Sequence, residues 1–159
     1  MLKCFFLFLL LPVSALVSAQ FHYPTDCFRC PVDSTLCLAG NFGEIRPNHL
    51  HAGFDIKTNN REGMPIYAAA DGFISRIKIS PYGYGKALYI AHPNGYTTVY
   101  AHLQSFHGVI GDLARNIQAS KEVFEIDTLI SAPVMAVKKG DLIGLSGNTG
   151  GSMGPHLHF

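Results

Sequence analysis

The chain has 159 residues, among them 12 Lys and Arg, 11 Asp and Glu, 8 His and no Trp. This near balance of charge gives no electrostatic footprint for nucleic acid or for an anionic membrane, and a hydrophobic content of 48% argues against disorder. The length suits one folded domain. The histidines stand out, because imidazole is the commonest protein ligand for transition metals.

The first 19 residues have the features of a secretory signal peptide. Lys3 is their only charge, residues 4–13 are almost wholly apolar, and residues 17–19 (VSA) offer small side chains at a cleavage site. The apolar run is shorter than the roughly 20 residues that a bilayer requires. We therefore expect an exported protein, periplasmic or extracellular, that begins at Gln20 and is not inserted in a membrane once the signal is removed.

Three cysteines, Cys27, Cys30 and Cys37, follow the expected cleavage site. In an exported protein the default is a disulfide between two of them, which leaves one thiol over. The alternative is a zinc knuckle with His22 or His49 as a fourth ligand. No second C-x2-C pair is present to support that alternative.

The periodicity of the remaining chain is that of strands and tight turns. Residues 65–79 predict a hairpin around Asp71-Gly72, since Asp-Gly supplies the positive φ angles that a two-residue turn requires. Residues 87–103 predict a second hairpin around residues 93–95 (PNG). Alternation along its second strand places His102 on the face that points away from the core.

A helix is predicted only over residues 109–123. It belongs to a stretch, about residues 106–136, that interrupts the regular spacing of strands and turns. A turn is then predicted at residues 139–141 (KGD), followed by a short apolar strand. The glycine-rich residues 147–154 lead into the final HLHF segment.

His156 and His158 are two positions apart, which places both rings on one face of a strand, roughly 7 Å apart at the backbone. Two imidazoles at that spacing can share one small site. The alternative is a surface strand with alternating polar residues, although Leu157 and Phe159 are apolar.

His51 and Asp55 form a second pair, with His49 two residues before them. In an extended segment these three side chains face the same way, and Gly53 has no side chain to obstruct them. An imidazole and a carboxylate so arranged can bind one zinc ion. The alternative is a polar edge in which Asp55 only hydrogen-bonds His51.

With His158 added, His51 and Asp55 give two imidazoles and one carboxylate. This is the ligand count of a catalytic zinc site that keeps its fourth position open for water. His102 and His156 then remain as unligated imidazoles that can accept and donate protons.

Three motifs occur in order: NHLHAGFD (residues 48–55), YAHL (100–103) and GGSMGPHLHF (150–159). Together with the intervening strands, residues 41–159 resemble the lysostaphin-like zinc metallopeptidases, which cleave peptide bonds in bacterial peptidoglycan. The resemblance implies a mostly β domain, a small antiparallel sheet or sandwich with a groove, here with one helical insertion. Residues 20–40 are then an N-terminal leader.

The resemblance also implies roles for five side chains. His51, Asp55 and His158 correspond to the zinc ligands, and His102 and His156 to the catalytic pair. The implied cofactor is Zn2+ and the implied partners are peptidoglycan peptides. The sequence indicates no oligomeric state.

Two departures from the family pattern give further expectations. The stretch of residues 106–136 is longer than in most relatives, so we expect it to shape or cover the groove. Relatives continue beyond the HLHF motif, so the domain of residues 41–159 is expected to be cut off in its last active-site strand, with His158 on a fraying end.

Other functions and weaker assignments stay open at this point. The chain could be a catalytically inactive relative that activates cell-wall amidases, although all five motif side chains are present. The VKKGD segment (137–141) resembles the turn of a biotinyl or lipoyl carrier, which export argues against. Tyr84 or Tyr100 could assist an oxyanion. His92 and His107 are expected to be solvated loop residues.

Overall fold

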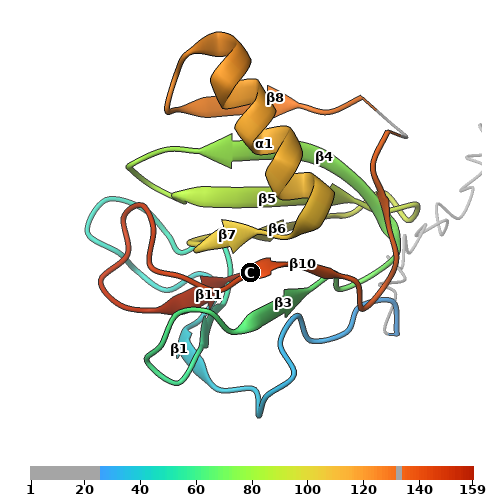
Figure 1. The fold of residues 1–159 in the computed structure, drawn as a ribbon. Coiled ribbons are helices and arrows are strands. Elements are labelled where there is room, and N and C mark those ends of the chain that lie inside the picture. Colours follow the sequence, from blue (N-terminus) through green and yellow to red (C-terminus); the bar gives the residue numbers. More distant parts are fainter. Residues whose placement is uncertain (1–25, 132–133) are drawn as a thin grey trace, which may run out of the picture.

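The computed structural model describes residues 26–131 and 134–159, so the expected signal peptide and His22 lie outside the described residues. Within them the chain forms short strands in three antiparallel sheets and a single α-helix (Figure 1). The predicted fold class, mostly β with antiparallel sheets and one helical insertion, is confirmed.

The largest sheet carries the predicted second hairpin. β5 (Lys86–Ala91) and β6 (Thr97–Tyr100) pair directly, as expected from the turn between them. β5 also pairs with β4 (Gly72–Ile79), which pairs in turn with β8 (Ile126–Leu129) and β9 (Ala136–Val137). The strand after the helix therefore extends this sheet.

Two further sheets contain three strands each. The order in one is β3 (Pro65–Tyr67), β10 (Leu142–Leu145) and β7 (Ser105–Phe106). The order in the other is β1 (Leu38–Gly40), β2 (Asp55–Lys57) and β11 (His156–His158). In this last sheet the segments that carry HAGFD and HLH are neighbours, although about 100 residues of sequence separate them.

The predicted hairpin around Asp71-Gly72 is wrong. β3 pairs with β10 and β4 pairs with β5, so the turn passes the chain from one sheet to another. The Asp71 carboxylate accepts hydrogen bonds from the backbone N–H of Lys139 and from Nζ of Lys138. The turn is thus tied to a distant turn of the chain, a long-range contact that local turn chemistry cannot predict.

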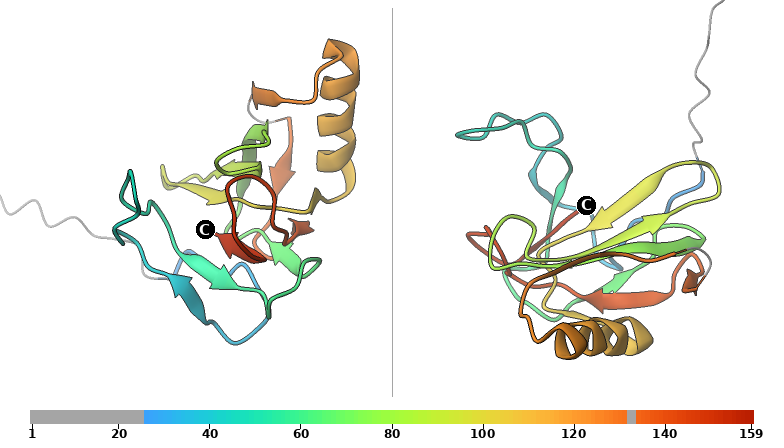
Figure 2. Two further views of the ribbon diagram at one scale, coloured as in Figure 1. Left: turned by 90° about the vertical axis from the view of Figure 1, so that its left-hand side faces the viewer. Right: turned by 90° about the horizontal axis from the view of Figure 1, so that it is seen from above.

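The predicted helix is confirmed as α1 (Gly108–Lys121). It buries Ile110 and Ala114 and ends at Glu122, whose left-handed backbone donates its N–H to the carbonyl of Ala119. In Figure 2 the helix lies on the side of the molecule away from β1 and β2. No helix of the described residues is both long and apolar enough to cross a bilayer.

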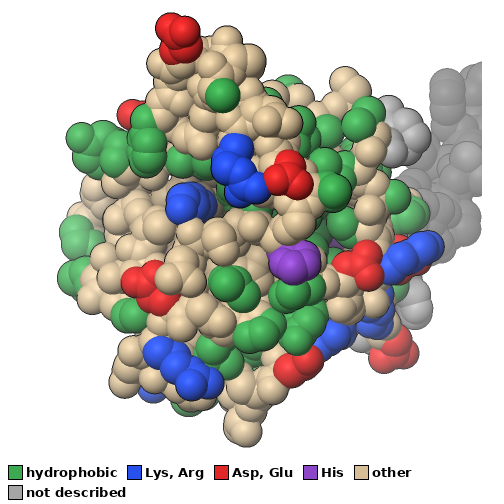
Figure 3. Space-filling view, viewed as in Figure 1, with side chains coloured by type: hydrophobic (Ala, Val, Ile, Leu, Met, Phe, Trp, Pro, Cys, Tyr) green, Lys and Arg blue, Asp and Glu red, His purple; other side chains and the backbone are tan. Residues whose placement is uncertain are grey.

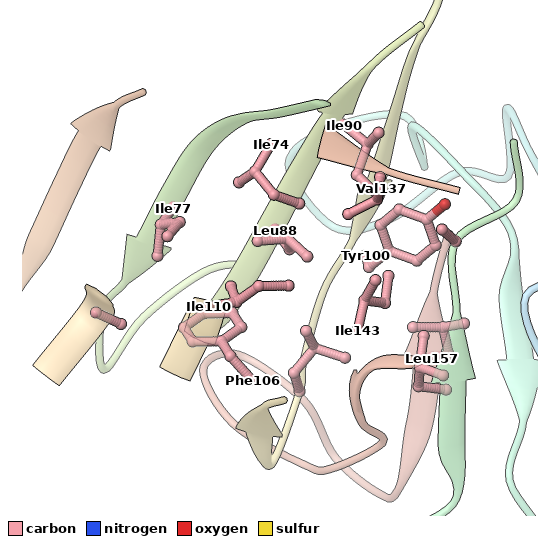
Figure 4. Close-up of a cluster of buried hydrophobic side chains, with 14 of the residues drawn as sticks. Ile74, Ile77, Leu88, Ile90, Tyr100, Phe106, Ile110, Val137, Ile143 and Leu157 are labelled. Atoms are coloured by element: carbon pink, nitrogen blue, oxygen red, sulfur yellow. The ribbon is translucent and has the colours of Figure 1, made fainter. Parts of the chain in front are cut away.

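One apolar core joins the three sheets and the helix (Figure 4). Ile74 and Leu88 enter it from the large sheet, Ile143 from β10, and Leu157 from between the two histidines of β11. Leu157 is fully buried, and burial of such a side chain stabilises the folded state by about 1.5–3 kcal/mol relative to leaving it exposed. The two histidines beside it are thereby directed to the opposite face of the strand.

Tyr100 also belongs to this core, with its hydroxyl accepting the N–H of Ala69 and a hydrogen bond from Thr98. Burial raises its pKa, so the phenol stays neutral. The suggestion that Tyr100 assists an oxyanion is therefore wrong.

Residues 26–40, the described part of the predicted leader, pack on the rest of the molecule. Val32 is buried in the core, Arg29 donates its backbone N–H to Ala69, and β1 forms the outer strand of the third sheet. The three described cysteines are free thiols, so the expected disulfide is absent from the described residues.

Acidic and basic side chains are scattered over the face in Figure 3, without a large patch of one sign.

Candidate metal centre

The three predicted ligands converge on one point. His51 Nε2 lies 3.0 Å from Asp55 Oδ1 and 2.9 Å from His158 Nδ1. His158 Nδ1 lies 3.1 Å from the same carboxylate oxygen. All three residues are buried, so little water competes for these atoms.

His51 lies in the segment of residues 41–54 that leads into β2. Its backbone N–H donates to the carbonyl of Glu44, and its Nδ1 lies 2.8 Å from the carbonyl oxygen of Asn41. Because a carbonyl oxygen can only accept, Nδ1 carries the proton and Nε2 presents a lone pair. A histidine that binds a metal ion through one nitrogen is typically oriented in this way through the other.

This donor set fits a zinc ion. The lone pair of His51, the carboxylate of Asp55 and the Nδ1 atom of His158 face one another at about 3 Å, a spacing compatible with one ion bonded to each at roughly 2.0–2.2 Å. Three such atoms repel one another unless a proton or a cation lies between them. Two imidazoles and one carboxylate also leave one tetrahedral position open.

Arg46 completes the surroundings of Asp55, and the sequence prediction missed it. Its Nη2 donates to Asp55 Oδ2 at 2.9 Å and contacts Glu44 at 3.2 Å, so Oδ1 is the oxygen left for the donor cluster. A Cβ at Gly40 would lie 2.3 Å from Arg46 Nη2 and 2.6 Å from Asp55 Oδ2, so a larger residue there would displace this ion pair. Arg46 belongs to no recognisable motif, so the one feature of the sequence that could have indicated its role is that charged residues are few in this segment.

β11 presents the two histidines side by side, as predicted. His158 is paired with Asp55 across the strands, and His156 with Lys57. The backbone carbonyl of His158 accepts the N–H of Ala101, so the expected fraying of this end is not observed.

The close approach of the HAGFD segment to β11 depends on Gly53. A Cβ there would lie 2.9 Å from His158 Nε2 and 2.6 Å from the carbonyl oxygen of Phe159. Phe54 and Phe159 exchange backbone hydrogen bonds on either side of this contact. Glycine is required here by the packing.

His102 reaches the site through a break in its strand. β6 ends at Tyr100, and His102 has a φ of 57°, a left-handed conformation that is uncommon for a residue other than glycine. Its backbone N–H donates to the carbonyl of Tyr84. The prediction that His102 faces away from the core is right in outcome, but the turned backbone produces it and strand alternation does not.

The two remaining imidazoles, His102 and His156, are oriented in the same way, each with Nδ1 on a backbone carbonyl. His102 Nδ1 lies 2.8 Å from the carbonyl oxygen of Thr149, and His156 Nδ1 lies 2.8 Å from that of Gly154. Both Nδ1 atoms therefore donate, which leaves Nε2 free to exchange a proton. The rings are 4.7 Å apart, and His156 Nε2 lies 3.4 Å from Asp55 Oδ1.

These surroundings shift three pKa values. Burial alone raises the pKa of Asp55, but contacts with His156 and His158 outweigh it and hold the pKa well below its usual range. Burial lowers the pKa of His102 to about 4, against the opposing hydrogen bond to Thr149. Burial also opposes protonation of His156, but the neighbouring Asp55 raises its pKa overall.

The cluster opens into a groove of about 550 Å³. β2, β11, Arg46 and the loop of residues 151–155 line it, together with Tyr84, whose ring packs 4.9 Å from that of His158. No described residue of the segment 106–136 lines the groove, so the expectation that this segment shapes it is wrong. Its strand β8 instead extends the largest sheet by pairing with β4.

The other histidines divide differently from the prediction. His107 is exposed at the start of α1, as expected. His92 is buried and hydrogen-bonded to the carbonyl of Asp71 and to Thr98, so its assignment as a solvated residue is wrong. His49 lines the groove, is exposed and contacts Asn48 rather than the donor cluster.

Comparisons with known proteins agree with this geometry. Residues 49–119 match the family described as peptidase family M23. The peptidoglycan DD-endopeptidase ShyA of Vibrio cholerae is 31% identical over 137 residues, which are 82% of this chain and 26% of that protein. The DD-carboxypeptidase/endopeptidase Mpg of Neisseria meningitidis is 36% identical over 110 residues, 69% of this chain and 19% of that protein.

This chain carries an M23 peptidase domain. A solved structure described as a zinc-containing peptidase from Vibrio cholerae has a TM-score of 0.59 and 28% identity, and the match covers 83% of this chain and 35% of that one. The chain spans about a fifth to a quarter of the length of the curated relatives named above. Of the five side chains predicted to form the site, His51, Asp55 and His102 lie within the residues matched by the family.

Proposed function

We propose that the chain is the catalytic domain of a zinc metalloendopeptidase that hydrolyses peptide bonds in peptidoglycan stem peptides or cross-links. The observation that supports it most is the convergence of a three-donor cluster and two further imidazoles in one groove. The names of the relatives support peptidoglycan as the substrate and the periplasm or the extracellular space as the place of action.

In this proposal His51, Asp55 and His158 hold zinc. Zinc in such a site supplies a Lewis acid for the scissile carbonyl and lowers the pKa of its water to roughly 7. His102 and His156 present Nε2 to the reacting atoms, because the carbonyls of Thr149 and Gly154 hold each Nδ1–H. They take up the proton of the attacking water, stabilise the oxyanion and return a proton to the leaving amine.

The test measures zinc content and muropeptide release for the chain and three variants. We expect His51→Ala to lose zinc and release together. His156→Ala should retain zinc while release falls about 10²–10⁴-fold, the usual contribution of a general acid or base. His107→Ala is the matched control, because it removes an exposed histidine outside the groove and should change neither quantity.

Bound zinc without muropeptide release in the wild-type chain would contradict the enzymatic proposal. It would favour a non-catalytic activator or scaffold of cell-wall amidases. No feature of the described residues favours that alternative at present.

A further inference from the structure

Lys57 lies in the groove, and the metal centre does not use it. It is two residues after Asp55 on β2, so both side chains are on the same face, about 6.6–6.8 Å apart at the backbone. Its strand neighbours fix that position. Its backbone N–H donates to the carbonyl of Cys37 on one side, and it is paired with His156 on the other.

The Lys57 ammonium has no partner in residues 26–131 and 134–159. Its Nζ makes no hydrogen bond there, and no carboxylate lies within 4.0 Å of it. The groove offers no free anion either, because Asp55 is the single acidic residue among its described lining and already faces Arg46 and the histidines. Lys57 is therefore a cation available to a ligand.

Arg46, the other cation in the groove, is occupied. It forms ion pairs with Asp55 and with Glu44, so its guanidinium orients the Asp55 carboxylate and is already neutralised by protein carboxylates. Asn60 follows in the loop after β2 and also lines the groove, and its amide makes no hydrogen bond to another described residue. The groove lining thus offers a ligand one cation and one amide that have no partner among the described residues.

We propose that Lys57 binds a carboxylate of the substrate, so that the groove selects peptides with a free carboxylate close to the scissile bond. This inference rests on the proposed function, which places the scissile bond at the donor cluster. An extended peptide advances by roughly 3.3 Å per residue, so a carboxylate near Lys57 belongs to a residue one or two positions from that bond. On a peptide the anion is a side-chain carboxylate or the C-terminal one.

The test uses synthetic stem peptides in matched pairs. One pair differs by a C-terminal carboxylate against a C-terminal amide, and the other by a side-chain carboxylate against its amide. We measure the binding constant of each peptide to the metal-free chain and kcat/KM with the zinc-loaded chain. For the wild type we expect the acid of one pair to be preferred about tenfold in both measurements, as for a charged hydrogen bond that is partly exposed.

Three variants locate the effect. Lys57→Met should abolish the preference, and Lys57→Arg should retain most of it, while Lys121→Met removes an exposed lysine outside the groove and should leave it unchanged. A preference that survives Lys57→Met, or no preference in the wild type, would overturn the inference.

The two measurements separate this inference from the proposed function. Selective binding without cleavage would support the role of Lys57 and contradict the peptidase activity. Cleavage without selectivity would do the reverse. The pair that shows the preference identifies the source of the carboxylate: the C-terminal pair indicates a carboxypeptidase-type substrate, and the side-chain pair an acidic residue beside an internal bond.

Discussion

At the scale of single residues, the Arg46–Asp55 pair determines how the carboxylate is presented. Arg46 binds Oδ2 and leaves Oδ1 for His51 and His158. Without that hydrogen bond the carboxylate can rotate, and Oδ1 is then no longer held toward His51 and His158. Residues that orient a ligand typically change metal affinity 10–100-fold when they are removed.

We therefore predict that Arg46→Met weakens zinc binding by roughly 10–100-fold, and that Arg46→Lys weakens it less. The measurement is the zinc dissociation constant from competition with a chromophoric chelator at pH 7. Arg115→Met is the control, because Arg115 is exposed on α1 and pairs only with Asp112 among the described residues. An unchanged zinc affinity in a folded Arg46→Met variant would show that Arg46 does not position the ligand.

At the scale of elements, sequence reasoning succeeded where local pattern decides the structure. The hairpin of β5 and β6 and the helix α1 follow from turn residues and periodicity, and both are confirmed. The strand face that carries His156 and His158 follows from spacing alone. What failed was pairing over long distances: the partner of β3 is β10, which lies more than 70 residues away.

The site itself was predictable in part for the same reason. His51 and Asp55 are close in sequence, whereas the turned backbone of His102 and the contact of Arg46 with Asp55 depend on tertiary packing. His92 was predicted to be solvated because it precedes a turn, but its ring is buried and hydrogen-bonded to Asp71 and Thr98. A motif gives the residue types, and the packing gives their orientation.

The helix α1 is expected to stabilise the fold without contributing to the metal centre. Ile110 is 5% exposed and belongs to the core, whereas its neighbour Val109 is 67% exposed. We predict that Ile110→Ala lowers the free energy of unfolding by about 2–4 kcal/mol in urea titrations and leaves the zinc dissociation constant unchanged. Val109→Ala should alter stability by less than about 0.5 kcal/mol. A matching loss of zinc affinity in Ile110→Ala would indicate that the helix supports the site.

At the scale of the whole molecule, the metal centre links distant parts of one chain. Asp55 on β2 and His158 on β11 are 103 positions apart, and His51 joins them from the segment before β2. An unfolded chain does not hold these donors together, so an ion that binds all three binds the folded state preferentially. Zinc should then stabilise the fold by mass action.

We predict that zinc at 100 times its dissociation constant raises the free energy of unfolding by about 2.7 kcal/mol, and that a chelator reverses the rise. Urea titrations at fixed free zinc measure it. His51→Ala leaves two of the three donors, so the rise should largely disappear, whereas His107→Ala should retain it because His107 is exposed at the start of α1. Equal stabilisation of wild type and His51→Ala would mean that zinc binds elsewhere. If zinc stabilises only the chains that retain His51, then the cation joins the segment before β2 to β2 and β11 in the folded state.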